Sequence, residues 1–273
     1  MNDYKQVFLQ VDGVRTSIFC YEAEGGVSVF AEMPGHGDSD IPCWADLASL
    51  RGWFSKAVEM VSEKFRGRKI LIFLHGLNGS AYGFRFLEPK MRKMLDLMKK
   101  GEVRIVAHSF GCMAIPKELA KKTVFLTPVP TVTRFYRKTL RVAGGVFRSR
   151  VVVFIHRRSL MAFLRGLVIS IRRDVVGLSR VYRVGRYERR MKRDKRIWQV
   201  RLAQECLVGE IFAGIRPVGV VFGTRDGMPR EQSAEALGVI FPGAKIVAVR
   251  AGHLLPIEYP ERAAEAIEKV FKS

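Results

Sequence analysis

A serine flanked by small residues is the first feature of this sequence that could do chemistry. Ser109 stands in "AHSFG", after the aliphatic run 103–107 and before a helical pattern. Ala107 and Gly111 are small, which a sharp strand-to-helix turn requires because it brings these two neighbours close together. Such a turn projects the serine hydroxyl from the end of a sheet and aims the backbone N–H of Phe110 at a developing oxyanion. A match of five residues is a weak signal by itself.

An acid and a histidine follow Ser109 in comparable settings. Asp226 comes just after the aliphatic run 218–222, in "FGTRDG", and His253 follows the run 244–249, in "RAGHLLP". Both lie at the carboxyl end of an expected strand, where open α/β sheets collect their sites. The chain therefore carries a serine, an acid and a histidine, in that order, at three strand ends.

These motifs, with "LHGLNGS" and "MPGHGDSD", resemble the α/β-hydrolase superfamily, in particular its esterase and C–C-hydrolase-like branch with a helical lid. The resemblance covers roughly residues 26–130 and 206–273. It implies that Ser109 is the nucleophile and that His253 is the general base and then the acid. Asp226 would orient the imidazole and stabilise its charged form.

The resemblance also implies an oxyanion hole and a supporting loop. The backbone N–H groups of Phe110 and Leu77 would form the hole, and Leu77 directly follows His75 and Gly76. His36, in the other His-Gly pair, is expected to stabilise its loop through hydrogen bonds and not to act as a base. This chemistry needs no cofactor.

Short β-rich runs alternate with helical patterns outside the centre of the chain. An opening hairpin is expected over 5–26, turned at Asp12 and Gly13. Helices are expected over 43–65 and 260–271. Six further runs are apolar on both sides and indicate buried parallel strands: 27–33, 69–76, 103–109, 123–129, 218–224 and 244–252. The sequence thus predicts an α/β fold, a mostly parallel sheet with helices on both faces.

The two His-Gly motifs occur in an order that differs from the family pattern. In most relatives the His-Gly oxyanion strand precedes the strand ending in PGHGxS, whereas here "PGHGDSD" comes first. One explanation is rearranged connectivity near the N-terminus, with strands 27–33, 69–76 and 103–109 side by side in chain order. The other is that "LHGLNG" is a decayed elbow with Gly76 in place of the serine, which predicts an inactive homologue. We favour the first, because Ser109 has the small neighbours of an elbow.

Positive charge is concentrated in one segment. The formal net charge is +21, and residues 131–205 hold 21 Lys and Arg against four Asp and Glu. Arg158, Arg165 and Arg172 recur every seven residues between apolar stretches, which indicates amphipathic helices with an arginine stripe. We expect this segment to be an arginine-rich helical cap inserted into a core formed by 1–130 and 206–273. Its apolar stretches are too often interrupted by charge to cross a bilayer.

The cysteines, the histidines and the first residues of the sequence bear on metal binding and on location. Four cysteines occur without a CxxC pair, and the five histidines include no HExxH motif, so no metal site is expected. The first residues lack the pattern of a signal peptide, so the expected location is the cytoplasm, with peripheral association at a membrane surface as an option.

The sequence therefore predicts a serine hydrolase that cleaves a carboxylic ester or thioester through an acyl-enzyme. The basic cap favours an anionic or membrane-associated substrate over nucleic acid, because its aromatic residues are not spaced as a base-stacking platform. Acyl transfer, lactone hydrolysis and C–C cleavage use the same machinery and stay open. The alternative is an inactive hydrolase-like protein that binds a membrane surface or polyanion through the cap.

Overall fold

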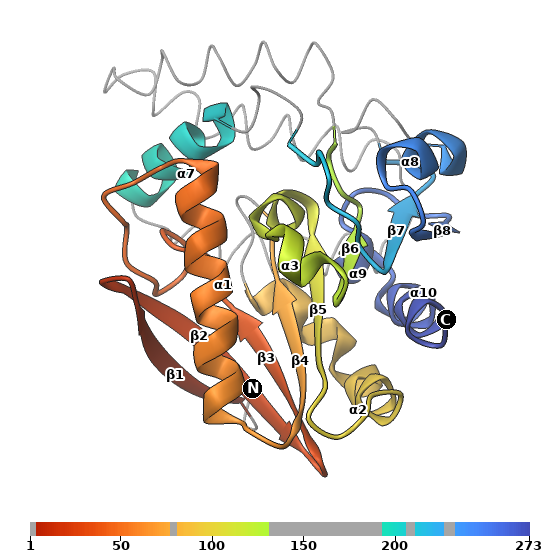
Figure 1. Cartoon of the computed structure of the whole chain (residues 1–273), viewed down its shortest axis with the longest axis horizontal. Coiled ribbons are helices and arrows are strands. Elements are labelled where there is room, and N and C mark those ends of the chain that lie inside the picture. Colours follow the sequence, from red (N-terminus) through yellow and green to blue (C-terminus); the bar gives the residue numbers. More distant parts are fainter. Residues whose placement is uncertain (1–3, 77–80, 131–192, 206–210, 227–232) are drawn as a thin grey trace.

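The computed structural model describes residues 4–76, 81–130, 193–205, 211–226 and 233–273. Eight strands in these residues form one sheet, in which they lie side by side in the order of the chain (Figure 1). They are β1 (Tyr4–Val11), β2 (Val14–Ala23), β3 (Gly26–Ala31), β4 (Lys69–Leu74), β5 (Val103–His108), β6 (Thr123–Leu126), β7 (Gly219–Gly223) and β8 (Lys245–Val249).

The first strands are antiparallel and the rest are parallel. β1 and β2 form the predicted hairpin, with Val11 opposite Val14. Asp12 and Gly13 between them have φ of 49° and 76°, and these positive values belong to the two-residue turn that matches the twist of a hairpin. β2 is antiparallel to β3, and every later pair is parallel. The predicted fold class, a mostly parallel α/β sheet, is confirmed.

The predicted rearrangement near the N-terminus is also confirmed. β3, β4 and β5 are consecutive neighbours, with Ala31 opposite Leu74 and Leu74 opposite Ala107. The carboxyl ends of the three strands are therefore level. The residues that follow each strand, from Glu32, His75 and Ser109 onward, must emerge together at one edge of the sheet.

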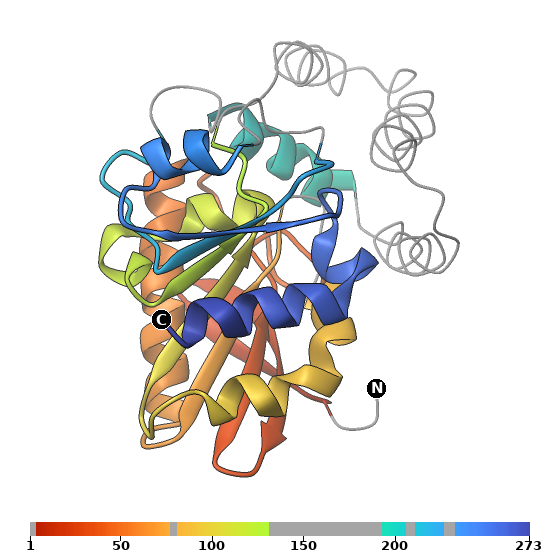
Figure 2. The same ribbon diagram turned by 90° about the vertical axis from the view of Figure 1, so that its right-hand side faces the viewer.

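Helices cover both faces of the sheet (Figures 1 and 2). On one face α1 (Leu47–Lys64) buries Trp53 and Phe54. Its N-cap is Asp46, whose side chain accepts a hydrogen bond from the N–H of Ser49 at 2.8 Å. The opposite face is covered by α2 (Glu88–Asp96) and α10 (Pro260–Phe271). The other helices in the described residues are η1 (Ala81–Leu87), η2 (Ser109–Ala114), α3 (Lys117–Ala120), α7 (Arg193–Glu205), α8 (Ala234–Ile240) and α9 (Leu255–Glu258).

The helical run expected after Ser109 is shorter and more broken than its sequence suggested. The 3-10 helix η2 ends at Ala114, and the four-residue helix α3 starts only at Lys117. Pro116 is the physical reason: the residue before a proline is driven out of helical conformation, and Ile115 has an extended ψ of 117°.

The predicted cap lies largely outside the described residues. Of the range 131–205, the structure describes α7, and the arginines of the stripe fall in the part that it does not describe. Among the helices that are described, none has the length and apolar character needed to span a membrane.

Candidate active site

The turn that follows β5 carries Ser109 in a strained conformation. Its φ is 56°, in the left-handed region that costs a residue with a side chain about 1–3 kcal/mol. Close packing holds the turn, because a β-carbon on Gly111 would lie 2.5 Å from the carbonyl oxygen of His75. Only glycine fits there, which explains the small residue two places after the serine. Ser109 is thus placed in the sharp strand-to-helix turn that its sequence predicts.

The structure brings Ser109, His253 and Asp226 into direct contact. Nε2 of His253 lies 2.7 Å from Oγ of Ser109, and Nδ1 of the same ring lies 2.7 Å from Oδ2 of Asp226. All three side chains are buried. A carboxylate accepts a hydrogen bond and cannot supply one, so Nδ1 carries a proton and Nε2 is left to accept the serine proton.

A close approach between two loops places the acid beside the histidine. A β-carbon on Gly223, at the end of β7, would lie 2.5 Å from the carbonyl oxygen of Ala251, so the backbones after β7 and β8 are in contact. The N–H of Asp226 closes the β7 turn by donating to the Gly223 carbonyl at 3.1 Å. Asp226 and His253 are therefore positioned by backbone, independently of their own pairing.

Two side chains fix the backbone of His253. Its carbonyl oxygen accepts from Nε2 of His108 at 2.9 Å and from the hydroxyl of Thr127 at 3.0 Å. His108 must carry its proton on Nε2 to make this bond. Burial, and then the neighbouring His253, lower the pKa of His108 to about 3, so its ring is neutral at ordinary pH.

The candidate oxyanion donors are described in part. Gly76 follows β4 and lies against the serine, since a β-carbon on it would be 3.2 Å from Oγ of Ser109. Phe110 is the second residue of η2, where backbone N–H groups have no partner within a helix. Leu77 lies outside the described residues. Among the described side chains, no group of three or more His, Cys, Asp or Glu could hold a metal ion.

Comparison with known proteins identifies the fold family. The family model described as the alpha/beta hydrolase family matches residues 15–266. The chain belongs to this family. No curated protein sequence matches the chain.

Solved structures similar to this alpha/beta hydrolase include enzymes of different activities. An esterase from Thermogutta terrifontis has a TM-score of 0.63 and 13% identity, with 98% of each chain covered. An esterase from Exiguobacterium antarcticum has a TM-score of 0.63 and 12% identity, covering 98% of this chain and 100% of its own. A haloalkane dehalogenase from Bradyrhizobium elkani has a TM-score of 0.62 and 10% identity, covering 99% and 98%. At such identities the likeness concerns the fold.

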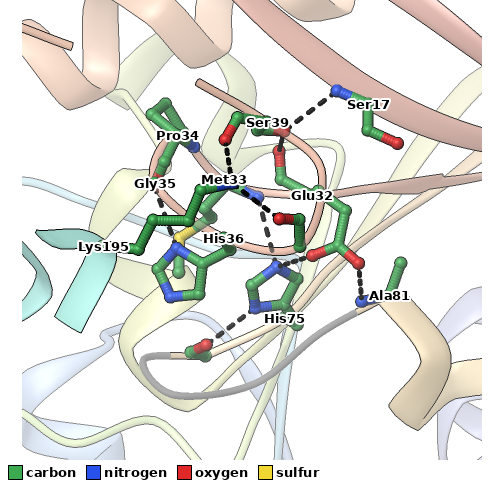
Figure 3. Close-up of polar contacts among 12 residues, drawn as sticks. Ser17, Glu32, Met33, Pro34, Gly35, His36, Ser39, His75, Ala81 and Lys195 are labelled. Atoms are coloured by element: carbon green, nitrogen blue, oxygen red, sulfur yellow. Dashed lines mark hydrogen bonds and ion pairs between the residues drawn. The ribbon is translucent and has the colours of Figure 1, made fainter. Parts of the chain in front are cut away.

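The "PGHG" loop of this alpha/beta hydrolase, residues 34–40, lies against His75 and is closed by its own contacts (Figure 3). Nδ1 of His36 lies 2.9 Å from the carbonyl oxygen of Pro34, and the ring of His36 stands 4.8 Å from that of His75. Burial holds the pKa of His36 well below its usual value, so the ring is neutral. These contacts are those of a residue that stabilises its loop.

Helix α7 packs on this same loop, a contact that sequence reasoning missed. Nζ of Lys195 donates to the carbonyl oxygens of Gly37 and Ser39, at 2.7 and 2.6 Å. The ring of Trp198 covers Gly35, where a β-carbon would stand 2.7 Å from the indole. The glycines of the loop could have indicated this contact, because a backbone without side chains permits another element to approach closely.

Proposed function

We propose that this alpha/beta hydrolase is a serine hydrolase that cleaves a carboxylic ester or thioester through an acyl-enzyme. The observation that carries the proposal is the position of His253, with one ring nitrogen 2.7 Å from Ser109 and the other 2.7 Å from Asp226. This is the arrangement in which a base activates a hydroxyl nucleophile and a third group orients the base. The esterase activity of two similar structures supports the same reaction class.

In this proposal each group takes one step. Oγ of Ser109 attacks the carbonyl carbon of the substrate while its proton passes to Nε2 of His253. The imidazolium, stabilised by Asp226, then gives this proton to the departing alkoxide or thiolate, and an acyl-serine is left. Water repeats the sequence: His253 takes its proton, the hydroxide adds to the acyl carbon, and Ser109 leaves with the proton returned from Nε2.

In this proposal the backbone N–H groups of Phe110 and Leu77 stabilise the tetrahedral oxyanion. A donor of this kind contributes about 10²- to 10³-fold in kcat where one has been removed from other hydrolases. The contact between Gly76 and Ser109 supports the assignment, because it brings the start of the second donor's segment to the nucleophile.

The basic segment 131–205 is proposed to act as a cap that favours an anionic or membrane-associated substrate. Its 21 basic residues against four acidic ones give a strong positive field, which raises the local concentration of anionic molecules. The docking of α7 on the "PGHG" loop supports a place for this segment near the site. The proposed partner is thus a small acyl ester or thioester, with an anionic membrane surface as its possible source.

Labelling with a fluorophosphonate probe tests the proposal. The folded wild-type protein is expected to be labelled on Ser109 and to hydrolyse para-nitrophenyl esters, and Ser109→Ala is expected to do neither. A wild type that is folded, unlabelled and inactive on a panel of esters and thioesters overturns the proposal. Binding to anionic liposomes that persists under those conditions would favour the inactive binder instead.

A further inference from the structure

A buried carboxylate lies beside the site and has no role in the proposed reaction. Glu32 directly follows β3 and its side chain is fully buried. Taking a carboxylate out of water costs several kcal/mol unless other groups compensate it. Figure 3 shows the compensation: Oε1 accepts from the N–H of Ala81 at 3.1 Å, and Oε2 lies 2.9 Å from Nε2 of His75.

The contacts of His75 require one proton between it and Glu32. Nδ1 of His75 lies 2.7 Å from the carbonyl oxygen of Gly76, which only accepts, so Nδ1 carries a proton. Nε2 of the same ring accepts from the N–H of Met33 at 3.2 Å, so the second proton that its 2.9 Å approach to Oε2 needs is held by Glu32. With this proton on the acid both partners are neutral, which explains why the pair is tolerated in the interior.

The two partners of Glu32 flank one short segment. His75 and Gly76 precede residues 77–80, and Ala81 follows them. One carboxylate therefore ties both flanks of the segment that begins with the proposed oxyanion donor Leu77. A trans peptide has its C=O and N–H on opposite sides. The bond from His75 to the Gly76 carbonyl thus constrains the orientation of the peptide whose N–H would face the substrate.

The "PGHG" loop closes over this carboxylate. A β-carbon on Gly37 would lie 2.7 Å from the carboxyl carbon of Glu32, and the φ of Gly37 is 45°. The hydroxyl of Ser39 donates to the Glu32 carbonyl at 3.3 Å. Because the loop excludes water, the bonds to His75 and Ala81 have no competing solvent and are stronger than on a surface.

We propose that Glu32 is a positioning residue for the hydrolysis: it holds both flanks of segment 77–80 and, through His75, orients the peptide that supplies an oxyanion donor. The inference rests on the proposed function. It predicts that loss of the carboxylate weakens stabilisation of the transition state while ground-state binding of the substrate stays intact.

Three variants separate this role from a merely structural one. Glu32→Gln keeps both contacts, because its amide oxygen accepts from Ala81 and its amide N–H donates to Nε2 of a neutral His75. Glu32→Met has similar length and no polar atom that can replace them. Glu268→Met is the matched control, since Glu268 is also a buried carboxylate. It lies on α10 and pairs with Lys93 of α2 at 2.7 Å, on the face of the sheet that α2 and α10 cover.

The measurements are kcat and KM on para-nitrophenyl esters and the Ki of a trifluoromethyl ketone, which adds to the serine as an oxyanion. For Glu32→Met we expect kcat to fall about 10²-fold and Ki to rise by a similar factor, with KM changed less than about threefold. Glu32→Gln should keep kcat within about fivefold, because both hydrogen bonds persist. Glu268→Met should lose stability and keep kcat.

The outcomes distinguish the two proposals. A wild type that turns over esters, together with a folded Glu32→Met variant that keeps its kcat or loses kcat without a matching rise in Ki, overturns the positioning role alone. A wild type with no turnover and no ketone binding overturns the proposed function and this role with it. If Glu32→Met does not fold, His75→Phe, which keeps the ring volume and removes both nitrogens, is judged by the same criteria.

Discussion

Gly76 and Ser109 are in contact at the centre of the candidate site. A β-carbon on Gly76 would stand 2.7 Å from the β-carbon of Ser109, closer than such atoms approach in proteins. The glycine follows β4 and the serine follows β5, and these two strands are neighbours in the sheet. The chain-order arrangement of the sheet therefore creates this contact directly.

Replacing Gly76 by alanine is expected to displace the serine. The added methyl group overlaps Ser109, and a shift of about 1 Å at a reacting group costs on the order of 10²-fold in rate. We expect the rate of fluorophosphonate labelling and kcat to fall by about that factor in Gly76→Ala. The control is Gly52→Ala in α1, where the methyl group meets open space and alanine favours the helix. Labelling of Gly76→Ala at the wild-type rate would contradict the proposed geometry.

The buried neutral state of His108 predicts a loss of stability in acid. Its folded pKa of about 3 lies below the usual value near 6.5, so the unfolded chain binds the proton more readily. The stabilising contribution is complete above about pH 6.5 and is lost as the pH falls toward 3. At pH 5 this one group lowers the free energy of unfolding by about 2 kcal/mol relative to pH 7.

Urea denaturation of His108→Gln at pH 7 and pH 5 checks this effect. The amide N–H of glutamine can still donate to the His253 carbonyl, but the side chain does not titrate. The decrease in unfolding free energy between the two pH values should therefore be about 2 kcal/mol smaller than in the wild type. His36, whose pKa is also lowered by burial, keeps part of the acid dependence in both proteins. An unchanged decrease would show that His108 is not the group responsible.

Much of this fold could be predicted because its signals are local. Aliphatic runs predicted the parallel strands, and Asp12 with Gly13 predicted the hairpin turn. The serine, acid and histidine were found in the sequence because each directly follows such a strand. The broken helix after Ser109 was missed although Pro116 was visible, since the apolar pattern continued through it.

The support around the site could not be predicted in the same way. Glu32 after a strand has the pattern of an ordinary loop residue, and only the pairing of β3 with β4 brings it to His75. Likewise, nothing local to Lys195 indicates that it bonds to a loop about 160 residues earlier. Such contacts depend on tertiary arrangement, which periodicity and composition do not encode.

The contact between Gly35 and Trp198 predicts how strongly α7 is docked. Alanine at Gly35, where φ is 68°, costs about 1–2 kcal/mol for its backbone and about 1–3 kcal/mol more for overlap with the indole. Gly67→Ala is the matched control, because its φ is 79° and a β-carbon there meets nothing. Urea denaturation should show a larger loss of unfolding free energy for Gly35→Ala than for Gly67→Ala. When Gly35→Ala is made in a Trp198→Leu background, its additional cost should fall to that of Gly67→Ala. Equal losses in the two single variants would mean that α7 is not held at this loop.

The charge of segment 131–205 predicts a salt-dependent preference for anionic substrates. Screening weakens the attraction of a basic surface for an anion and leaves a neutral molecule unaffected. For two esters of equal acyl length, one with a phosphate-bearing alcohol and one with a neutral alcohol, KM of the first should rise about tenfold between 50 and 500 mM salt and that of the second less than about twofold. Exchanging Arg158, Arg165 and Arg172 for glutamine should raise KM for the anionic ester in low salt and leave kcat on the neutral ester unchanged. Equal salt dependence of KM for both esters would show that the cap does not select the substrate by charge. That result would not contradict the proposed chemistry at Ser109.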